Sequence, residues 1–575
     1  MANYKCDHQD VFFNLFDVLK IDQIEKYGLD KPSIKEILSE YDKFIENEIY
    51  PTRVKSDVEG VKLTETGVKV PEFLHAPTKM FYEMGWFALG LPEDIGGTPV
   101  PEAMAAVCRS LNMAANTGWS AYPGLTKSAM NVMRLRGDDF VKSTFIQPIM
   151  EGRWGGTMCL TEAGAGSDVG NLKTTAKPIE AKEGWYQIKG TKIFITSGDS
   201  DLYENNIHLV LARTPNAPEG TKGISLFLVP REKLDGSGNN DVICSGIEHK
   251  MCLHISATAV LNFGENDKCE GYLLGKEFDG MKNMFIMMNE ARLDCGMQGE
   301  AQANLAYEMS KQYVNERVQF GTEIINHPDV KKMMLKMRAV SRGLRSLMLY
   351  TADLFDKAHE DKKWQSYIEL LTPICKSYGS EQGFNIAVDA VQAHGGYGYC
   401  HEYGIEQFVR DTKIATIYEG TNGIQAIDFV MRKILKDEGK TLGHVVNDIK
   451  NAVAKLPQGY EAEKLIFENS LSAAQEAIGH ISKCAASKQM NLVLQSCKDF
   501  LDLSGHLIVA WRLMESALIS DTRLKKSEFE GDQEKHFLET KIVDFKIYTS
   551  QYLPIVSAYK DSITNAKEDM TTFNL

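Results

Sequence analysis

The stretch Trp185-Tyr186-Gln187-Ile188, followed closely by Lys192-Ile193-Phe194-Ile195-Thr196, decides the fold class of this chain. Both runs are rich in aromatic and β-branched residues, which is the composition typical of strands. A third such run, His208-Leu209-Val210-Leu211, comes shortly afterwards. Because turn-forming Gly, Pro and Asn residues separate these short runs, they predict a compact antiparallel sheet or barrel-like unit rather than a parallel sheet.

Helical patterns lie on both sides of this β-rich segment. Apolar residues recur at helical spacing from Ile34 to Tyr50, until Pro51 interrupts the pattern, and long amphipathic patterns return from Gly280 to about Leu435. A further helical block runs from about Thr441 to the end. The chain is therefore predicted to be α+β, mostly α. Its expected parts are an N-terminal helical domain (1–155), a middle antiparallel β-barrel-like domain (156–275), a helical bundle domain (276–438) and an extra C-terminal helical domain (439–575).

The composition narrows the classes of function. The chain has 575 residues, 43% of them apolar and 25% charged, which is a globular profile. Its net charge of -14 disfavours a general nucleic-acid binder. The eleven cysteines form no CxxC pair, so we expect neither a disulfide framework nor a metal site. The start of the chain lacks the features of a secretory or mitochondrial leader, and no run approaches 18 apolar residues, so we expect a cytoplasmic protein without a membrane span.

The segment Thr157-Met158-Cys159-Leu160-Thr161-Glu162-Ala163-Gly164-Ala165-Gly166-Ser167-Asp168 is rich in small residues and hydroxyls. Backbone N–H groups in such a loop suit a phosphate or the polar edge of a flavin. The segment is not a dinucleotide fingerprint, because Val169 stands where the third glycine is required. The alternative is a tight turn stabilised by Ser and Asp.

Two other segments offer groups that could hold a phosphate. Gln392-Ala393-His394-Gly395-Gly396-Tyr397-Gly398-Tyr399 could bring backbone amides close to a ligand, or could simply end a helix. Arg317 follows a long helical pattern, where its guanidinium could bind a pyrophosphate or interact with the helix dipole.

Glu419 lies in Ile417-Tyr418-Glu419-Gly420-Thr421, directly after an apolar stretch. Burial at the edge of an apolar region raises the pKa of a carboxylate, which suits a general base acting on a carbon acid. The alternative is an ordinary solvated surface carboxylate.

Taken together and in order, these segments resemble the acyl-CoA dehydrogenase family from about residue 35 to residue 435. The chain resembles in particular the long bacterial subfamily with an extra C-terminal domain, which includes 3-methylmercaptopropionyl-CoA dehydrogenases and broad-range fatty acyl-CoA dehydrogenases. The matching segments are Leu91-Pro-Glu-Asp-Ile-Gly-Gly, Met158 to Asp168, Gly190-Thr-Lys-Ile-Phe-Ile-Thr-Ser-Gly, Arg317-Val-Gln-Phe-Gly, Gln392-Ala-His-Gly-Gly and Arg410 to Gly420.

The resemblance implies FAD-dependent dehydrogenation of an acyl-CoA thioester, with an electron-transfer flavoprotein as acceptor. Glu419 would remove the α-proton while the β-hydrogen leaves as hydride to flavin N5. The resemblance also implies a homodimer whose extra domain covers the surface that shorter members use for tetramers. The base of some members precedes the position of Arg292, but here that residue is Ala291, and Glu290 lies about 100° around the helix.

The residues that the resemblance assigns fall into two sets. Non-covalent FAD binding is assigned to Met158, Leu160, Thr161, Gly166, Ser167, Phe194, Ile195, Thr196, Arg317, Phe320, His327, Gln392, Gly395, Gly396 and Thr421. Acyl-CoA binding is assigned to Ser167, Arg292 and Gly420.

Two rival functions remain at this stage. An acyl-CoA oxidase would pass electrons to oxygen and cannot be told apart by sequence. A DNA-associated homologue would need a basic C-terminal block, whereas residues 441–575 hold 15 Lys+Arg and 18 Asp+Glu, a net charge of -3.

Overall fold

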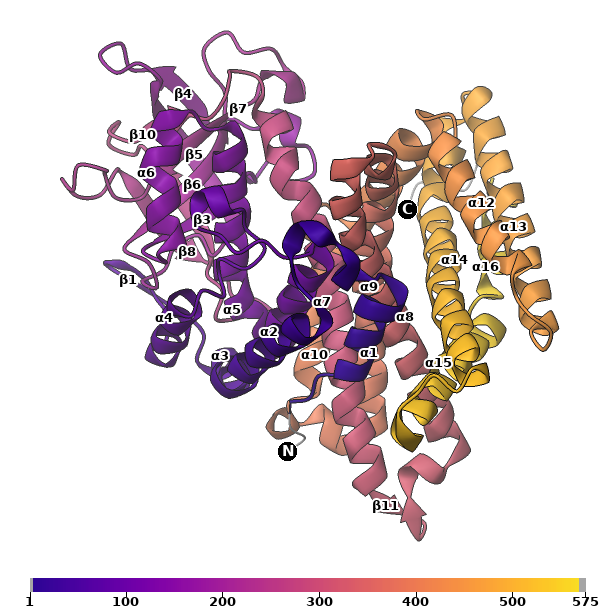
Figure 1. Cartoon of the computed structure of the whole chain (residues 1–575). Helices are drawn as coiled ribbons and strands as arrows, with labels where there is room; N and C mark the ends of the chain where they lie inside the picture. The colour runs from indigo at the N-terminus through magenta and orange to yellow at the C-terminus, as the bar shows by residue number, and fades with distance from the viewer. Residues whose placement is uncertain (1–3, 568–575) are drawn as a thin grey trace. The chain divides into compact units, whose positions relative to one another are not determined.

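A computed structural model describes residues 4–567 (Figure 1). The chain divides into two compact units. The sheet unit consists of Lys43–Val100 and Ala115–Ala291. The helical unit takes the chain up to Asp42, Pro101–Ala114, and the chain from Arg292 onward.

One mixed sheet forms the centre of the sheet unit. Its strands are β3 (Trp154–Cys159), β4 (Thr175–Pro178), β5 (Trp185–Thr196), β6 (Asn205–Ala212), β7 (Ser225–Pro230), β8 (Val242–Ile247), β9 (Thr258–Phe263) and β10 (Glu270–Leu273). The order is β3-β6-β7-β10-β5-β9-β8, and β4 also pairs with β5. All pairs are antiparallel except β3–β6, which is parallel.

The expected mostly helical α+β fold is confirmed, with two refinements to the middle domain. The β3–β6 pair departs from the purely antiparallel expectation. Within the described residues the strand path also stays open between β3 and β8, so no closed barrel forms. Every residue of β6 and β7 is buried, and the core of this unit also takes in residues of β3, β4, β5, β8 and β9.

Two of the expected strands are one continuous strand. β5 runs from Trp185 to Thr196, and its register against β9 shifts between Lys192 and Ile195. Phe194 lies in this bulge with a φ of +58° and an exposed ring. A bulge turns a side chain away from the regular alternation of the strand, which explains why this large aromatic residue faces outward.

Helices and a small hairpin complete the sheet unit. They are α3 (Arg53–Glu59), α4 (His75–Glu83), part of α5 (Glu102–Arg136), α6 (Asp139–Met150), β1 (Lys62–Thr64) and β2 (Gly67–Lys69). The long α5 breaks at Asn116, where φ is -157° and ψ is 91°. The Asn116 side chain accepts a hydrogen bond from the Trp119 N–H at 3.1 Å, which caps the second part of α5.

The helical unit contains the remaining helices. They are α1 (His8–Phe12), α2 (Lys31–Phe44), most of α7 (Gly280–Glu316), α8 (Pro328–Glu360), α9 (Lys363–His394), α10 (Glu406–Lys413), α11 (Asn422–Ile427), α12 (Lys440–Ala454), α13 (Glu461–Ala486), α14 (Met490–Lys525), α15 (Gly531–Gln551) and α16 (Ile555–Thr564). A two-stranded hairpin, β11 (Val318–Gln319) and β12 (Thr322–Glu323), separates α7 from α8. In Figure 1 the late helices α12 to α16 (orange to yellow) gather around α14, which packs against α8, α9 and α11 as well as α15 and α16.

A buried group of charges joins the N-terminal segment to α8 and α15. Asp10 is fully buried and pairs with the Arg345 guanidinium at 3.0 Å and with the Lys541 ammonium. Asp544 on α15 pairs with Arg342 at 3.0 Å. Because both signs are present and hydrogen-bonded, these charges can remain buried without the full cost of isolated ions.

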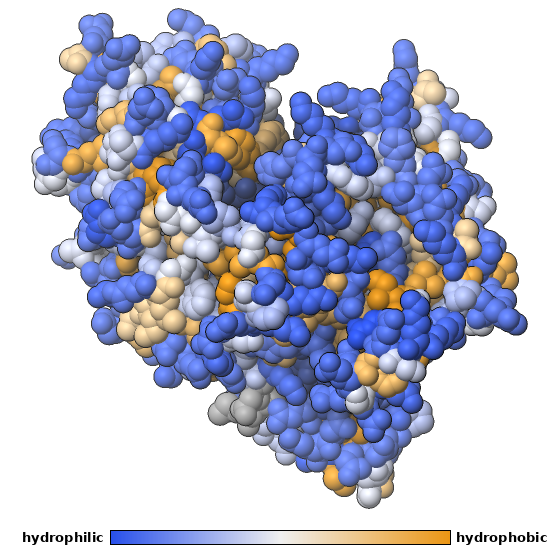
Figure 2. Space-filling model, viewed as in Figure 1, coloured by the Kyte–Doolittle hydropathy of each residue, from blue (hydrophilic) through white to orange (hydrophobic). Residues whose placement is uncertain are grey.

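The surface seen in Figure 2 is mostly hydrophilic, with apolar residues in scattered patches. This agrees with the 25% of charged residues in the composition. Among the helices described, none combines the length and the apolar character that crossing a membrane requires.

Candidate active site

Glu419 lies in a turn that places its backbone in an uncommon conformation. Its φ is +57°, and Gly420 follows at +83°, so two consecutive residues adopt left-handed geometry between α10 and α11. For a non-glycine residue this conformation is uncommon and costs free energy, and such residues concentrate at functional sites. Gln425 on α11 donates a hydrogen bond to the Glu419 carbonyl oxygen at 3.1 Å, which helps to hold the turn.

Two opposing effects act on the pKa of the Glu419 carboxyl. Burial raises the pKa of its carboxyl, while the Arg292 guanidinium and the Lys376 ammonium lower it. Burial has the larger effect, so the pKa stays above the ordinary value. A carboxylate of this kind accepts a proton more readily than a solvated one, which is the property a general base for a weak carbon acid needs.

Lys376 is a fully buried cation in α9 that the sequence analysis did not single out. Its ammonium donates to the Asn422 side-chain oxygen at 2.8 Å. Burial lowers the pKa of Lys376 to about 8, against an opposing effect of nearby acidic groups that include Glu419. The signal was available in the sequence, because this lysine follows the apolar run Leu370 to Cys375 inside a buried helix.

Arg292 contacts the same part of the helical unit. Its guanidinium pairs with Asp428 at 3.4 Å, and both side chains are largely buried. Thr421 caps α11, since its hydroxyl accepts the Ile424 N–H at 3.3 Å. The structure therefore brings Glu419 and Arg292 into electrostatic contact, with Gly420 and Thr421 in the same turn.

The small-residue loop after β3 is held by a buried ion pair. Glu162 accepts hydrogen bonds from the Lys173 N–H at 2.7 Å, the Thr174 N–H at 3.0 Å and the Thr174 hydroxyl at 2.6 Å. It also pairs with the fully buried Lys192 of β5 at 2.8 Å. Lys192 donates a second bond to the Leu160 carbonyl oxygen at 3.1 Å. This pair fixes the loop to the sheet, and the sequence analysis missed it.

The loop and the β5 bulge lie side by side. The Ile193 N–H donates to the Thr161 carbonyl oxygen at 2.9 Å, directly before the exposed ring of Phe194. The candidates Leu160, Thr161 and Phe194 therefore belong to one local surface, with Met158, Ile195 and Thr196 on the strands that carry it. Gly166 and Ser167 are exposed on the loop itself.

In two candidate loops, no steric clash within the described residues explains why glycine occupies three of the positions. A Cβ at Gly164 or at Gly396 would meet no described atom within 4 Å, and one at Gly166 would meet only the Thr161 methyl at 3.9 Å. None of the three has the positive φ that requires glycine. Glycine at these positions leaves room for a bound group to approach the backbone closely.

A third group of candidates lies around the β11–β12 hairpin. The Arg317 guanidinium lies over the Tyr397 ring, with 5.4 Å to the ring centroid, which connects the hairpin to the Gly395–Gly396 turn after α9. Phe320 is 96% exposed and its ring lies 5.8 Å from that of His327. Gln392, Gly395 and Gly396 are also exposed.

Glu290, the alternative base, has a polar neighbour of its own. Asn131 donates to its carboxylate at 3.4 Å, and both residues belong to the sheet unit.

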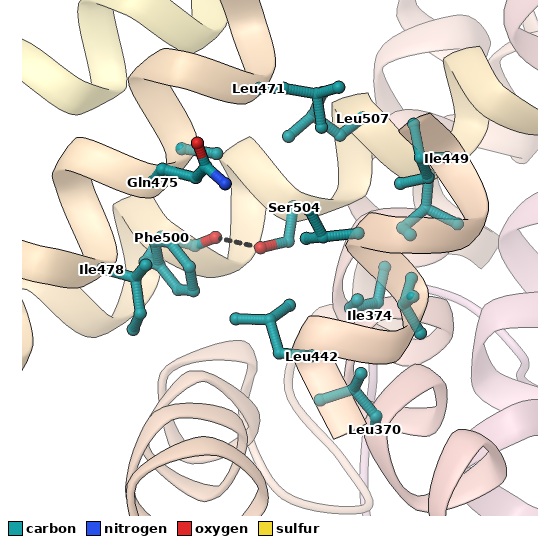
Figure 3. Close-up of a pocket in the computed structure, with 14 residues that line it drawn as sticks. Leu370, Ile374, Leu442, Ile449, Leu471, Gln475, Ile478, Phe500, Ser504 and Leu507 are labelled. Carbon is teal, nitrogen blue, oxygen red and sulfur yellow. Dashed lines mark hydrogen bonds between the residues drawn. The ribbon is translucent and has the colours of Figure 1, made fainter. Parts of the chain in front are cut away.

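An apolar cavity lies between α9, α12, α13 and α14 (Figure 3). Its volume is about 50 Å³, and Leu370, Ile449, Phe500 and Leu507 are among the residues that line it. Ligand pockets usually measure about 300 Å³ or more, so this cavity is a packing gap rather than a site for an acyl-CoA.

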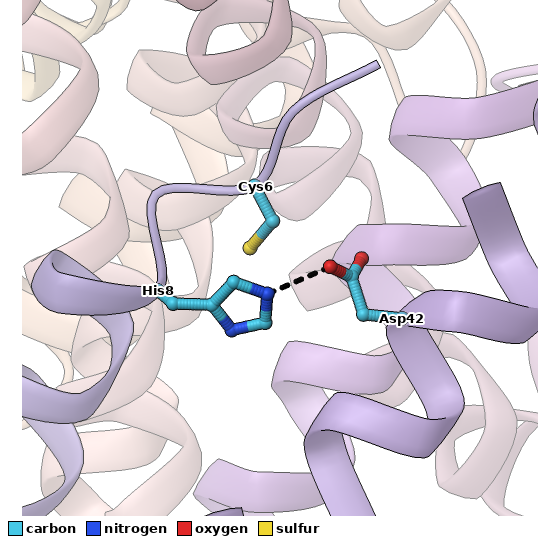
Figure 4. Close-up of side chains that lie close together, drawn as sticks. All are labelled: Cys6, His8 and Asp42. Atoms are coloured by element: carbon cyan, nitrogen blue, oxygen red, sulfur yellow. Dashed lines mark hydrogen bonds and ion pairs between the residues drawn. The ribbon is translucent and has the colours of Figure 1, made fainter.

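Cys6, His8 and Asp42 present side-chain atoms within 4.8 Å of one another, the one such group of possible metal ligands among residues 4–567 (Figure 4). Both Asp42 oxygens already accept hydrogen bonds, from the Tyr4 hydroxyl at 2.6 Å and from His8 at 2.7 Å. Burial, followed by the nearby Asp42 carboxylate, raises the pKa of the Cys6 thiol well above its usual value. A protonated thiol is a poor ligand. The group is best explained as a contact between the N-terminal segment and α2.

Three family models match the chain. The acyl-CoA dehydrogenase middle-domain model matches residues 157–263, and the acyl-CoA dehydrogenase C-terminal-domain model matches residues 279–435. A model described as acetyl-CoA dehydrogenase C-terminal like matches residues 426–574.

Relatives match the chain over its whole length. The 3-methylmercaptopropionyl-CoA dehydrogenase of Ruegeria pomeroyi is 35% identical, with 100% of both chains covered. The broad-specificity linear acyl-CoA dehydrogenase of Mycobacterium tuberculosis is 32% identical, with 99% of both chains covered. The structure of a Bacillus anthracis acyl-CoA dehydrogenase complexed with FAD has a TM-score of 0.74 at 22% identity, and covers 97% of this chain and 93% of that one.

Proposed function

This chain belongs to the acyl-CoA dehydrogenase family, and from that premise we propose that it dehydrogenates an acyl-CoA thioester to the trans-2-enoyl-CoA, with Glu419 as the base that removes the α-proton. The proposal rests on the environment of the Glu419 carboxyl. Burial raises its pKa, and a left-handed turn gives it a fixed backbone direction.

The protein's own part in the reaction is to hold and move a proton. Glu419 takes the α-proton of the thioester, and its raised pKa makes that transfer less unfavourable than it would be to a solvated carboxylate. As negative charge develops on the thioester oxygen, a backbone N–H in the turn can donate a hydrogen bond to it. Arg292 and Lys376 supply positive charge to the neighbourhood of the base.

The residues present fit FAD held without a covalent link. In the sheet unit, the open glycines of the Met158–Ser167 loop and the exposed Phe194 ring offer backbone donors and an aromatic surface. In the helical unit, Arg317 offers a guanidinium suited to a pyrophosphate, and Gly395 and Gly396 offer exposed backbone. When bound, the flavin supplies the hydride acceptor at N5. We further propose that Ser167, Arg292 and Gly420 contact the acyl-CoA.

We propose an electron-transfer flavoprotein as the acceptor of the electrons and the bacterial cytoplasm as the location. The rival assignment is an acyl-CoA oxidase. Release of hydrogen peroxide at the rate of acyl-CoA turnover would favour the oxidase, while turnover that depends on the flavoprotein or on an artificial acceptor would favour the dehydrogenase.

The four-part division into 1–155, 156–275, 276–438 and 439–575 remains our proposal, with an architectural role for the last part. A net charge of -3 over residues 441–575 gives no support to DNA binding. We also propose a homodimer. Light scattering that gives the mass of a tetramer would contradict it, and a salt-sensitive gel shift with duplex DNA would contradict the architectural reading.

The direct test compares the wild type with Glu419→Gln, which keeps the shape of the side chain but cannot take a proton. A panel of short-, medium- and long-chain and thioether acyl-CoAs is mixed with each protein, and flavin bleaching is followed. We expect the variant to retain its flavin and to lose about a hundredfold or more in bleaching rate. Wild-type rates in the variant would place the base elsewhere, and bleaching by no thioester would remove the dehydrogenase assignment.

A further inference from the structure

The turn that carries Glu419 is anchored by the first residue of α11. Asn422 is 5% exposed and follows Glu419 and its two neighbours Gly420 and Thr421. Because the two residues before Thr421 adopt left-handed geometry, the direction of the Glu419 side chain depends on where α11 begins. Whatever fixes Asn422 therefore fixes the base.

Three side chains of α9 hold Asn422. Its side-chain oxygen accepts the Lys376 ammonium at 2.8 Å. Its side-chain N–H₂ donates to the Glu381 carboxylate at 2.9 Å and to the Ser380 hydroxyl at 3.2 Å. The amide of Asn422 is thus satisfied on both sides, and its position follows that of Glu381.

Glu381 is in turn held from the extra C-terminal block. Its second carboxylate oxygen pairs with the Lys498 ammonium of α14 at 2.8 Å. Lys498 also contacts both oxygens of Asp502, one turn later on α14, at 2.5 Å and 2.6 Å. An unbroken series of charged or polar contacts therefore runs from α14 through Glu381 and Asn422 to the turn of Glu419.

Lys498 lies among several acidic and polar groups. Burial, with a contribution from the neighbouring Glu381 carboxylate, raises the pKa of Asp502 to about 7. Asp499 and the Tyr559 hydroxyl also lie within electrostatic range of Asp502. Lys498 is the cation shared by Glu381 and Asp502, since its ammonium pairs with both. The Lys498 and Glu381 side chains are 33% and 31% exposed, so this shared contact is half-buried.

We propose that Lys498, in the C-terminal block, is a positioning residue for Glu419 and acts through Glu381 and Asn422. The inference rests on the proposed function of Glu419. The inference gives the C-terminal block a part in the chemistry. The side chains of α9 hold the turn of the proposed base only in part, and Lys498 of α14 completes that support.

The test uses the full-length protein with FAD and follows flavin bleaching by butyryl-CoA, or by whichever panel thioester bleaches the wild type fastest. The variants are Lys498→Met, Lys498→Arg, Glu381→Gln and the double variant Lys498→Met/Glu381→Gln. Lys525→Met is the matched control, because Lys525 also lies on α14 and pairs with Asp521 four residues earlier at 2.6 Å, but on the exposed surface.

We expect Lys498→Met to lower the bleaching rate at saturating thioester about tenfold, short of the hundredfold that a misplacement of about 1 Å can cause. Flavin content and the half-saturating concentration should stay at wild-type values, because the defect lies in the placement of the base. Lys498→Arg should restore the rate to within about twofold, since a guanidinium can also pair with both carboxylates. Glu381→Gln should lower the saturating rate as well, and the double variant should be no slower than the slower single variant.

A saturating rate for Lys498→Met within about twofold of Lys525→Met would overturn the proposal. So would a double variant whose loss equals the product of the single losses. If Lys498→Met fails to fold, Glu381→Gln and Lys498→Arg decide: a wild-type rate in Glu381→Gln would reject the connection. A slow Glu419→Gln variant together with a normal Lys498→Met variant would reject this inference alone, whereas a normal Glu419→Gln variant would reject the proposed function.

Discussion

Replacing Lys192 by Met removes one charge from the interior of the sheet unit while keeping most of the side-chain volume. The ammonium of Lys192 is fully buried and contacts the Glu162 carboxylate at 2.8 Å and the Leu160 carbonyl oxygen at 3.1 Å. After the change, Glu162 keeps its three bonds from Lys173 and Thr174, but its charge is no longer balanced. The Leu160 oxygen loses its bond from the ammonium.

The magnitude follows from these contacts. Removing one partner of a buried ion pair usually costs about 3–5 kcal/mol. The three remaining donors to Glu162 place this case at the lower end, so we expect a loss of about 3 kcal/mol in the free energy of unfolding. Because Leu160 and Thr161 belong to the proposed flavin loop, the variant should also retain less FAD.

Urea unfolding of the purified protein, together with flavin absorbance per chain, measures both effects. The control is Lys182→Met, which removes an exposed lysine that pairs with Glu270 at 2.6 Å in the same unit. An exposed pair is worth at most about 1 kcal/mol. If Lys192→Met costs no more than Lys182→Met, the buried pair does not hold the loop and our reasoning about it is wrong.

Three other predictions concern the helical unit. Asp10→Asn leaves buried cations without their anion, so we expect a loss of about 3–5 kcal/mol in urea unfolding, and a loss below about 1 kcal/mol would contradict the role of that group. Burial lowers the pKa of His506 to about 4, so the unfolded chain takes up the proton first as the pH falls. The free energy of unfolding should therefore drop by roughly 3 kcal/mol between about pH 6.5 and pH 4. His506→Asn should flatten this part of the stability–pH curve, and an unchanged slope would reject the prediction. Ala474→Val adds carbon to the apolar cavity and should raise stability by about 1 kcal/mol, whereas Ala473→Val, at a buried position that does not line the cavity, should not.

The order of helices, sheet and helices could be predicted because the hydrophobic period changes sharply along the chain. The parallel pairing of β3 with β6 could not, because strand pairing at that distance depends on contacts formed only in the whole fold. The bulge at Phe194 also left no local signal, since a positive φ is normally announced by glycine or asparagine.

The candidate site could be named from the sequence only through its ordered segments. The carboxylate of Glu419 looked like many others, and its left-handed backbone became visible only in the structure. Lys192 did leave a signal, because it shares the inward face of β5 with Ile188 in the period of two. The connection from Lys498 to Asn422 left none, since its members lie on separate helices and 76 positions apart, from 422 to 498.

The left-handed backbone at position 419 has a consequence for any attempt to engineer this protein. Glycine relieves the strain at such a position, and asparagine tolerates it better than glutamate does. A library selected for heat resistance alone would therefore enrich Glu419→Gly and Glu419→Asn, and its winners would be the variants that the proposed chemistry cannot use. Selection for thermal stability and selection for turnover therefore favour different residues at position 419. A screen for more stable variants of the protein needs an activity assay from its first round.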